Sequence, residues 1–181
     1  MSHQAITNQH AREYHDNGYT IVRGMFTPQE TELLYQTALE DELVRKNAFD
    51  LNDQTGKKTK LTLWYKPGDD IYGLLTRSKR MVDGVQTLLG KGEVCHYHSK
   101  LMQKEPRVGG AWEWHQDYGY WYENGCLTPD MLTVAVPLSS MSRRSGCLEL
   151  LRGSHRCGRV DHTRVGDQHG ADPARVAEIE A

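Results

Sequence analysis

EVCHYHSKLMQKEP, residues 93–106, is the stretch that decides the fold class of this chain. Successive side chains of a β-strand point to opposite faces of the sheet, so the stretch can be sorted into two sets. One set is His96, His98, Lys100 and Met102, and the other is Cys95, Tyr97, Ser99 and Leu101. We therefore predict a strand over residues 94–104, where the character of the chain changes from helical to β.

The sequence before this stretch indicates helices. A helix of about ten residues is expected to end at Asn17–Gly18, because glycine readily caps a helix C-terminus. A second is predicted near residues 28–45, where Thr27 and Glu30 form a capping box. A third amphipathic helix is predicted near residues 70–89, and residues 50–60 read as a polar loop.

Further strands are expected, one between the first two helices and three after residue 104. They are predicted at about residues 19–24, 111–117, 131–138 and 147–151. Helices in front and strands behind predict either an α+β fold or a mostly β fold with N-terminal helices. We expect a single domain over residues 1–181. Its parts are a helical portion over 1–92, strands over 93–160, and a polar tail over 161–181 in which Pro173 begins a new helix.

Composition limits the class of protein. The chain has 181 residues, 38% hydrophobic and 25% charged, with a formal net charge of −2. A basic excess that would favour nucleic acid is absent, and the apolar runs are far shorter than a bilayer span. The first twenty residues lack the apolar core of a signal peptide, and the four cysteines lack zinc-binding spacing. We expect a cytoplasmic protein with reduced thiols and neither a nucleic-acid nor a membrane partner.

A second stretch, AWEWHQDYGYW at residues 111–121, carries the candidate chemistry. On a strand, His115 and Asp117 would project from the same face. An imidazole beside a carboxylate makes two of the three ligands in a 2-His-1-carboxylate iron site. The alternative is a simple His–Asp hydrogen bond, or two surface residues at the end of the strand. The spacing alone does not decide between them.

The wider pattern resembles the phytanoyl-CoA dioxygenase family. The resemblance rests on KLMQKEP, then WHQDYGYW, then a long apolar strand, then SGCLELLRGSH, and runs from about residue 10 to the end. It implies a double-stranded β-helix, which is a jelly-roll or cupin-like fold. It also implies a non-haem Fe(II) dioxygenase that uses 2-oxoglutarate and O₂, with ascorbate as a reductant, to hydroxylate a small organic substrate. By this resemblance His115 and Asp117 are the first two iron ligands.

The resemblance also exposes a departure. Family members carry a second ligand His on a late strand, followed by an Arg that binds 2-oxoglutarate, and both are expected beyond residue 181. The chain is therefore interpreted as truncated, and its 181 residues expressed alone are expected to be inactive and poorly soluble. The remaining candidates for the third ligand are His155, His162 and His169, each of which reads better as a turn or surface residue.

Several other residues allow two interpretations each. Lys100 is interpreted either as a cation for 2-oxoglutarate or as a lysine at the strand edge. Trp114, Tyr118 and Trp121 are candidates for the substrate pocket, although many aromatic residues in this stretch should belong to the core. His96 and His98 could line the same pocket or be structural.

Two other functions stay open from the sequence. One is a catalytically silent cupin-like domain, or a non-functional fragment, that lacks the third iron ligand. The other is an isomerase or different metal cupin with the same His-x-Asp pair. The oligomeric state and the substrate are not specified by these patterns.

Overall fold

The computed structural model describes residues 4–90 and 92–181. The chain forms two compact units. The helical unit takes the described residues of Met1–Ala48, Thr62–Leu101 and Val136–Ser140. The hairpin unit takes Phe49–Leu61, Met102–Ala135 and Met141–Ala181.

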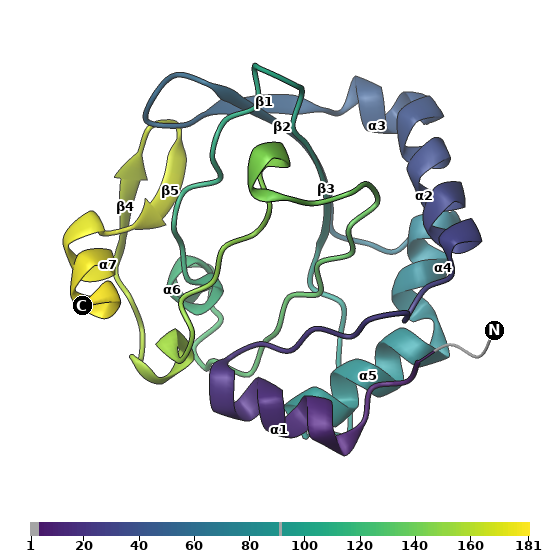
Figure 1. Cartoon of the computed structure of the whole chain (residues 1–181), viewed down its shortest axis with the longest axis horizontal. Helices are drawn as coiled ribbons and strands as arrows, with labels where there is room; N and C mark the ends of the chain where they lie inside the picture. Colours follow the sequence, from purple (N-terminus) through teal and green to yellow (C-terminus); the bar gives the residue numbers. More distant parts are fainter. Residues whose placement is uncertain (1–3, 91) are drawn as a thin grey trace. The chain divides into compact units, whose positions relative to one another are not determined.

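Five helices make up most of the helical unit. They are α1 (Asn8–Asn17), α2 (Pro28–Glu40), α3 (Glu42–Lys46), α4 (Ile71–Arg77) and α5 (Lys79–Leu89). The end of α1 is confirmed at Gly18, which adopts a left-handed φ of 85°. Helix α1 lies along α5 (Figure 1). Among all helices of the described residues, none is long and apolar enough to span a bilayer.

Two helices predicted as continuous are each divided in two. Asp41 ends α2 with extended backbone, and its carboxylate then caps α3 by accepting from Leu43 N at 2.8 Å and Val44 N at 3.1 Å. Ser78, also extended, separates α4 from α5. The apolar spacing alone did not indicate these breaks, because an N-cap residue can sit inside a periodic pattern and still begin a new helix.

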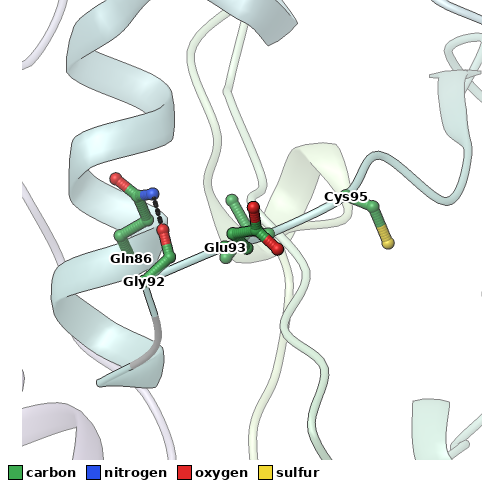
Figure 2. Close-up of a pocket in the computed structure, with 5 residues that line it drawn as sticks. Gln86, Gly92, Glu93 and Cys95 are labelled. Atoms are coloured by element: carbon green, nitrogen blue, oxygen red, sulfur yellow. Dashed lines mark hydrogen bonds between the residues drawn. The ribbon is translucent and has the colours of Figure 1, made fainter.

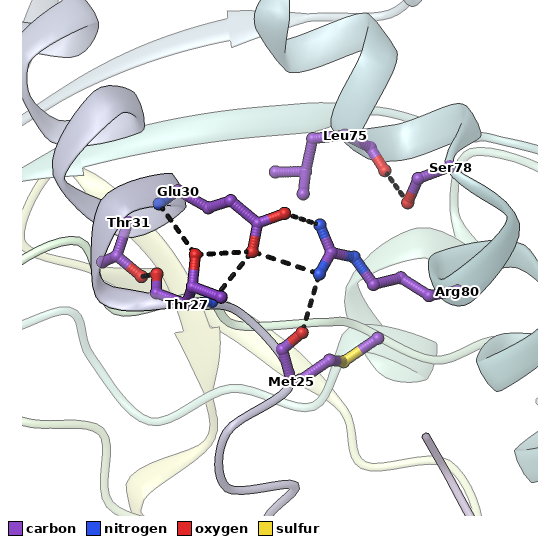
Figure 3. A network of polar contacts seen from close by, with 7 residues as sticks. All are labelled: Met25, Thr27, Glu30, Thr31, Leu75, Ser78 and Arg80. Carbon is purple, nitrogen blue, oxygen red and sulfur yellow. Dashed lines mark hydrogen bonds and ion pairs between the residues drawn. The ribbon is translucent and has the colours of Figure 1, made fainter. Parts of the chain in front are cut away.

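The helices of this unit enclose a small apolar core. Its buried residues are Leu34, Val44 and Tyr72, and Trp64, Ile71, Leu75, Leu101 and Leu138 pack against them. Beside it, the predicted capping box is confirmed, since Thr27 and Glu30 bond reciprocally. The Glu30 carboxylate also pairs with the Arg80 guanidinium, which donates to the Met25 carbonyl at 2.9 Å (Figure 3). This network links the start of α2 to α5.

Three strands form the larger sheet. They are β1 (Phe49–Asn52), β2 (Lys58–Trp64) and β3 (Ser99–Gln103), in the order β1-β2-β3. Strands β1 and β2 are antiparallel, with Phe49 opposite Leu61 and Asn52 opposite Lys58. The expectation of a polar loop over residues 50–60 was wrong, since its two ends pair as a hairpin. The strand predicted at 94–104 is confirmed only as the shorter β3.

A second hairpin lies in what the sequence presented as a polar tail. It consists of β4 (His162–Val165) and β5 (Gln168–Ala171), followed by α7 (Pro173–Glu180) (Figure 1). The helix start at Pro173 is confirmed. Val160, Ala171 and Val176 form the buried cluster of this unit, and Trp114, Leu151 and Ile179 pack against it. The tail therefore carries core residues.

Four of the predicted strands do not form. Residues 19–24, 111–117, 131–138 and 147–151 have no ladder partner, and short elements appear near them: α6 (Asp117–Tyr122), η1 (Arg143–Ser145) and η2 (Ser154–Arg156). A strand requires a hydrogen-bonded neighbour, and a residue pattern cannot supply one. The structure thus has helices and small antiparallel sheets, while a complete double-stranded β-helix stays a prediction.

Candidate metal centre

Residues 111–116 of the hairpin unit are held mainly by side chains. The Gln168 side-chain amide accepts from Glu113 N and donates to the Ala111 carbonyl, both at 2.9 Å. Farther along, the Trp114 carbonyl accepts from Ala171 N at 2.7 Å. The side-chain amide of this buried glutamine therefore pairs with the backbone of residues 111–113, as a neighbouring strand would. This explains why a segment predicted as a strand is fixed in place without a ladder.

His115 has a defined tautomer in this arrangement. Its Nδ1 lies 2.9 Å from the Glu113 carbonyl oxygen, which only accepts, so Nδ1 carries the proton. The lone pair of a neutral imidazole is then on Nε2, which lies 3.3 Å from Asp117 Oδ1. Metal-binding histidines commonly donate their other ring N–H to a carbonyl in this way.

Asp117 is oriented by two features. It is the first residue of α6, where a carboxylate is favoured by the helix dipole. Its Oδ2 accepts a hydrogen bond from the Thr133 hydroxyl, so Oδ1 is the oxygen that faces His115. The side chains of His115 and Asp117 are 25% and 35% exposed, which leaves the pair accessible from solvent.

The pair therefore meets as expected, but for a different local reason. The prediction placed both residues on one strand, and that was wrong, since Gln116 is extended and Asp117 already begins a helix. The structure nevertheless brings Nε2 and Oδ1 together. Two acceptor atoms at this distance repel each other unless a proton or a cation lies between them, so the donor set fits a divalent metal.

No third ligand joins the pair within the part of the chain that the structure describes. There, no group of three or more His, Cys, Asp or Glu side chains is arranged to hold a metal ion. His162 is fully engaged, because Nδ1 lies 2.8 Å from the Val160 carbonyl and Nε2 accepts from Gln116 N at 3.0 Å. Burial lowers the pKa of His162, which keeps the imidazole neutral. His155 lies in the short helix η2.

The third candidate, His169, belongs to an aromatic cluster. Its ring centroid lies 5.4 Å from that of Tyr120 and 5.7 Å from that of His162. Tyr120 in turn packs edge-on against Trp121 at 4.7 Å. This cluster lies between α6 and the second hairpin.

The predicted pocket residues are found in varied surroundings. Trp114 packs against the buried cluster around Val160. The Tyr118 hydroxyl donates to the Leu127 carbonyl at 3.2 Å, and its ring contacts Tyr122 edge-on. Trp121 contacts Tyr120. Their role in substrate binding stays a prediction.

Lys100 lies on β3 in the helical unit. The sequence predicts that it shares one strand face with His96 and His98. Its neighbour His96 bonds through Nε2 to Ser99 Oγ at 2.8 Å, and His98 packs edge-on against Tyr97. These contacts favour structural roles for the two histidines. The proposed role of Lys100 toward 2-oxoglutarate stays a prediction.

Two hollows lie elsewhere. One of about 470 Å³ in the helical unit follows α5 and is lined by Gln86, Gly92, Glu93, Val94 and Cys95 (Figure 2). The Gln86 amide donates to the Gly92 carbonyl across it. The other, in the hairpin unit, is bordered by charged residues such as Lys60 and Glu105, which form an ion pair at 2.7 Å. Neither is lined by His115 or Asp117.

Four residues support the pair: Thr133, Gln116, His162 and Gln168. The sequence did not indicate this role for any of them, although His162 was a candidate third ligand. Thr133 offered one signal, since it is the polar residue in the apolar stretch MLTVAV at residues 131–136. The other three act through the backbone of a segment distant in sequence, and no local pattern reveals such partners.

Comparison with known proteins identifies the family. The sequence model of the phytanoyl-CoA dioxygenase family matches residues 14–178. This chain belongs to the phytanoyl-CoA dioxygenase family. The resemblance predicted from WHQD and the GSH turn is thereby confirmed, and membership implies a cupin or jelly-roll fold.

Three curated relatives are similar to parts of the chain. L-proline trans-4-hydroxylase of Streptomyces griseoviridis is 35% identical over 106 residues, which are 58% of this chain and 39% of that protein. The probable alpha-ketoglutarate-dependent hypophosphite dioxygenase of Stutzerimonas stutzeri is 27% identical over 167 residues, 85% and 55% of the two chains. Ectoine dioxygenase of Sphingopyxis alaskensis is 25% identical over 156 residues, 83% and 50%. The chain spans about half the length of the curated relatives it matches.

Proposed function

We propose that this chain carries two of the metal ligands of a Fe(II)- and 2-oxoglutarate-dependent dioxygenase that hydroxylates a small organic substrate. The observation that supports this most directly is the pair of converging acceptors, His115 Nε2 and Asp117 Oδ1, 3.3 Å apart. Membership of the phytanoyl-CoA dioxygenase family adds to it, as do the printed names of the three relatives.

The chain's own residues would hold and orient the metal. His115 would bind through Nε2, because its Nδ1 proton is committed to the Glu113 carbonyl. Asp117 would bind through Oδ1, because the Thr133 hydroxyl engages Oδ2. Bound Fe(II), with 2-oxoglutarate and O₂, supplies oxidation of a C–H bond to an alcohol, with succinate and carbon dioxide as co-products. Ascorbate would serve as the reductant that keeps iron in the Fe(II) state.

We propose the substrate only as a class of compound. The relatives are named for proline, hypophosphite and ectoine, which are small and polar. Trp114, Tyr118 and Trp121 lie in or beside α6 and are the proposed pocket residues. Lys100 is proposed to provide a cation for a carboxylate of 2-oxoglutarate.

Metal binding is the direct test. Anaerobic titration of the protein with Fe(II), or with Co(II) as an optical probe, should give one site of low affinity, because only two side chains of the described residues converge on the ion. His115→Ala and Asp117→Asn should each abolish it, because one remaining side chain rarely holds a divalent ion against water. His155→Ala, also a histidine removal in the same unit, is the matched control and should bind as the wild type does. A wild-type protein that binds neither ion would overturn the proposal.

A second function is favoured by the same distance. If His115 is protonated, 3.3 Å fits an imidazolium–carboxylate ion pair, and the domain would be a binding module without metal chemistry. The titration separates the two, because an ion pair requires no metal. Formation of succinate from 2-oxoglutarate in the presence of Fe(II) and ascorbate would distinguish the dioxygenase from a metal cupin with other chemistry. It would also overturn the expectation that these 181 residues alone are inactive.

A further inference from the structure

The backbone between the two proposed ligands is bonded to a distant histidine. Gln116 N donates to His162 Nε2 at 3.0 Å. His162 Nδ1 lies 2.8 Å from the Val160 carbonyl, so Nδ1 carries the proton and Nε2 is free to accept. The imidazole of His162 therefore connects two backbone segments more than forty residues apart in sequence.

The Gln116 side chain also bonds to the backbone segment that contains Val160. Its Nε2 donates to the Gly158 carbonyl at 2.8 Å, and its Oε1 accepts from Val160 N at 2.9 Å. Together with the bond to His162, Gln116 is held at three atoms by residues 158–162. A residue held at its backbone and at both ends of its amide has little freedom to rotate.

Helix α6 packs directly on this connection. A Cβ placed on Gly119 would lie 2.2 Å from the Val160 carbonyl oxygen and 2.6 Å from His162 Nδ1. Only glycine allows such an approach. Because Asp117 is the first residue of α6, residues 158–162 fix the start of the helix as well as the residue before it.

We propose that His162 and Gln116 are positioning residues that hold the backbone between His115 and Asp117, so that Nε2 and Oδ1 converge on one metal ion. The inference rests on the proposed function, because it requires that the pair bind metal. His162 does not itself bind the ion, since both of its ring nitrogens face backbone groups. It acts on the site through the Gln116 amide.

The test uses three variants of the protein. His162→Phe keeps an aromatic ring but removes the acceptor for Gln116 N. His162→Gln returns an acceptor at about the reach of Nε2 and is the conservative variant. His169→Phe is the matched control, because it makes the same exchange on the paired strand, in a ring that packs against His162, and leaves the Gln116 bond intact.

Two measurements report on the proposal. The first is the Co(II) dissociation constant and visible spectrum under anaerobic conditions. The second is the hydrogen-exchange rate of the Gln116 amide, measured by NMR without metal. His162→Phe should weaken Co(II) binding about tenfold, as loss of a ligand-orienting group commonly does. It should also change the Co(II) spectrum and speed exchange at Gln116. His162→Gln should recover most of the affinity, and His169→Phe should bind as the wild type does.

Each outcome decides a different point. If the wild type binds Co(II) and His162→Phe binds it equally well, the positioning role is wrong while the metal site stands. If His169→Phe weakens binding as much as His162→Phe, ring packing and not the hydrogen bond is responsible, and the proposal also fails. If the wild type binds no metal, the proposed function fails first. Should His162→Phe not fold, Gln116→Met, which removes only the side-chain bonds, should show the same weakened binding; unchanged binding would contradict the proposal.

Discussion

The side-chain amide oxygen of Gln168 accepts a hydrogen bond from Glu113 N at 2.9 Å, and the amide nitrogen donates to the Ala111 carbonyl at 2.9 Å. Gln168 is only 4% exposed, and both of these bonds are partly buried. A buried backbone group that loses its partner costs about 1–3 kcal/mol. The segment that leads into His115 therefore depends on one glutamine.

Replacing this glutamine should destabilise the protein clearly. Gln168→Met preserves the length and apolar stem of the side chain but leaves Glu113 N and the Ala111 carbonyl without their partner. We expect a loss of about 2 kcal/mol or more in the free energy of unfolding, measured by urea denaturation. Gln54→Met is the control, because Gln54 donates to the Glu113 carboxylate on the exposed surface. Equal losses in the two variants would contradict the account.

A methyl group at Gly119 should be poorly tolerated. Its Cβ would overlap the Val160 carbonyl oxygen, which belongs to the backbone and cannot rotate away. Overpacking of this kind costs about 1–3 kcal/mol, so Gly119→Ala should lower the thermal midpoint measured by circular dichroism. Gly92→Ala is the control, since nothing lies within 4 Å of the added methyl group there. A Gly119→Ala protein as stable as the control would show that α6 can move.

Local signals in the sequence predicted the helical elements well. Thr27 and Glu30 form the expected capping box, Gly18 ends α1, and Pro173 begins α7. These signals work because a cap is formed by residues three or four positions apart, so the sequence contains both partners. The breaks at Asp41 and Ser78 were missed, because periodicity continues across them.

Strand pairing was harder to predict because it depends on distant residues. Residues 111–116 are fixed by Gln168 and Ala171, which no pattern within the segment indicates. The β4–β5 hairpin did leave a signal in Gly166–Asp167, a two-residue turn in which Gly166 has a φ of 62°. The signal was overlooked because the flanking residues are polar and gave no alternating apolar pattern.

Within the candidate site, the sequence predicted the two proposed ligands. His115 and Asp117 were named from spacing and family resemblance, and the structure does bring their side chains together. The helix that begins at Asp117 was not foreseen, because the aromatic residues after it favour strands as much as helices. The groups that orient the pair come from elsewhere in the chain and require a structure to be found.

The pair of Glu30 and Arg80 should make stability depend on pH at acidic values. The Arg80 hydrogen bonds, followed by that from Thr27 N, lower the pKa of Glu30 from 4.5 to about 2. A lowered carboxyl pKa contributes stability that is present above about pH 4.5 and is lost as the pH falls toward 2. Because the Glu30 side chain is 35% exposed, solvent screens the pair, and we expect only about 1 kcal/mol.

Urea unfolding of the wild type and Glu30→Gln at several pH values tests this. The difference in unfolding free energy should be largest near pH 6 and should shrink as the pH is lowered through this window. Glu178→Gln removes an exposed partner of Arg175, with side chains 61% and 64% exposed, and should change little at any pH. A Glu30→Gln difference that stays constant with pH would mean that ionisation of Glu30 does not stabilise the fold.

Thr133 provides the last prediction, which concerns the orientation of Asp117. The Thr133 hydroxyl donates to Asp117 Oδ2, and this leaves Oδ1 facing His115 Nε2. Thr133→Val keeps the shape of the side chain but removes the donor, so the carboxylate can turn away from the proposed metal. We expect Co(II) binding to weaken about tenfold, as for other groups that orient a ligand. Thr133→Ser keeps the hydroxyl and should bind nearly as the wild type does. If the serine and valine variants bind Co(II) equally, the hydroxyl does not orient Asp117, and other contacts hold the carboxylate in place.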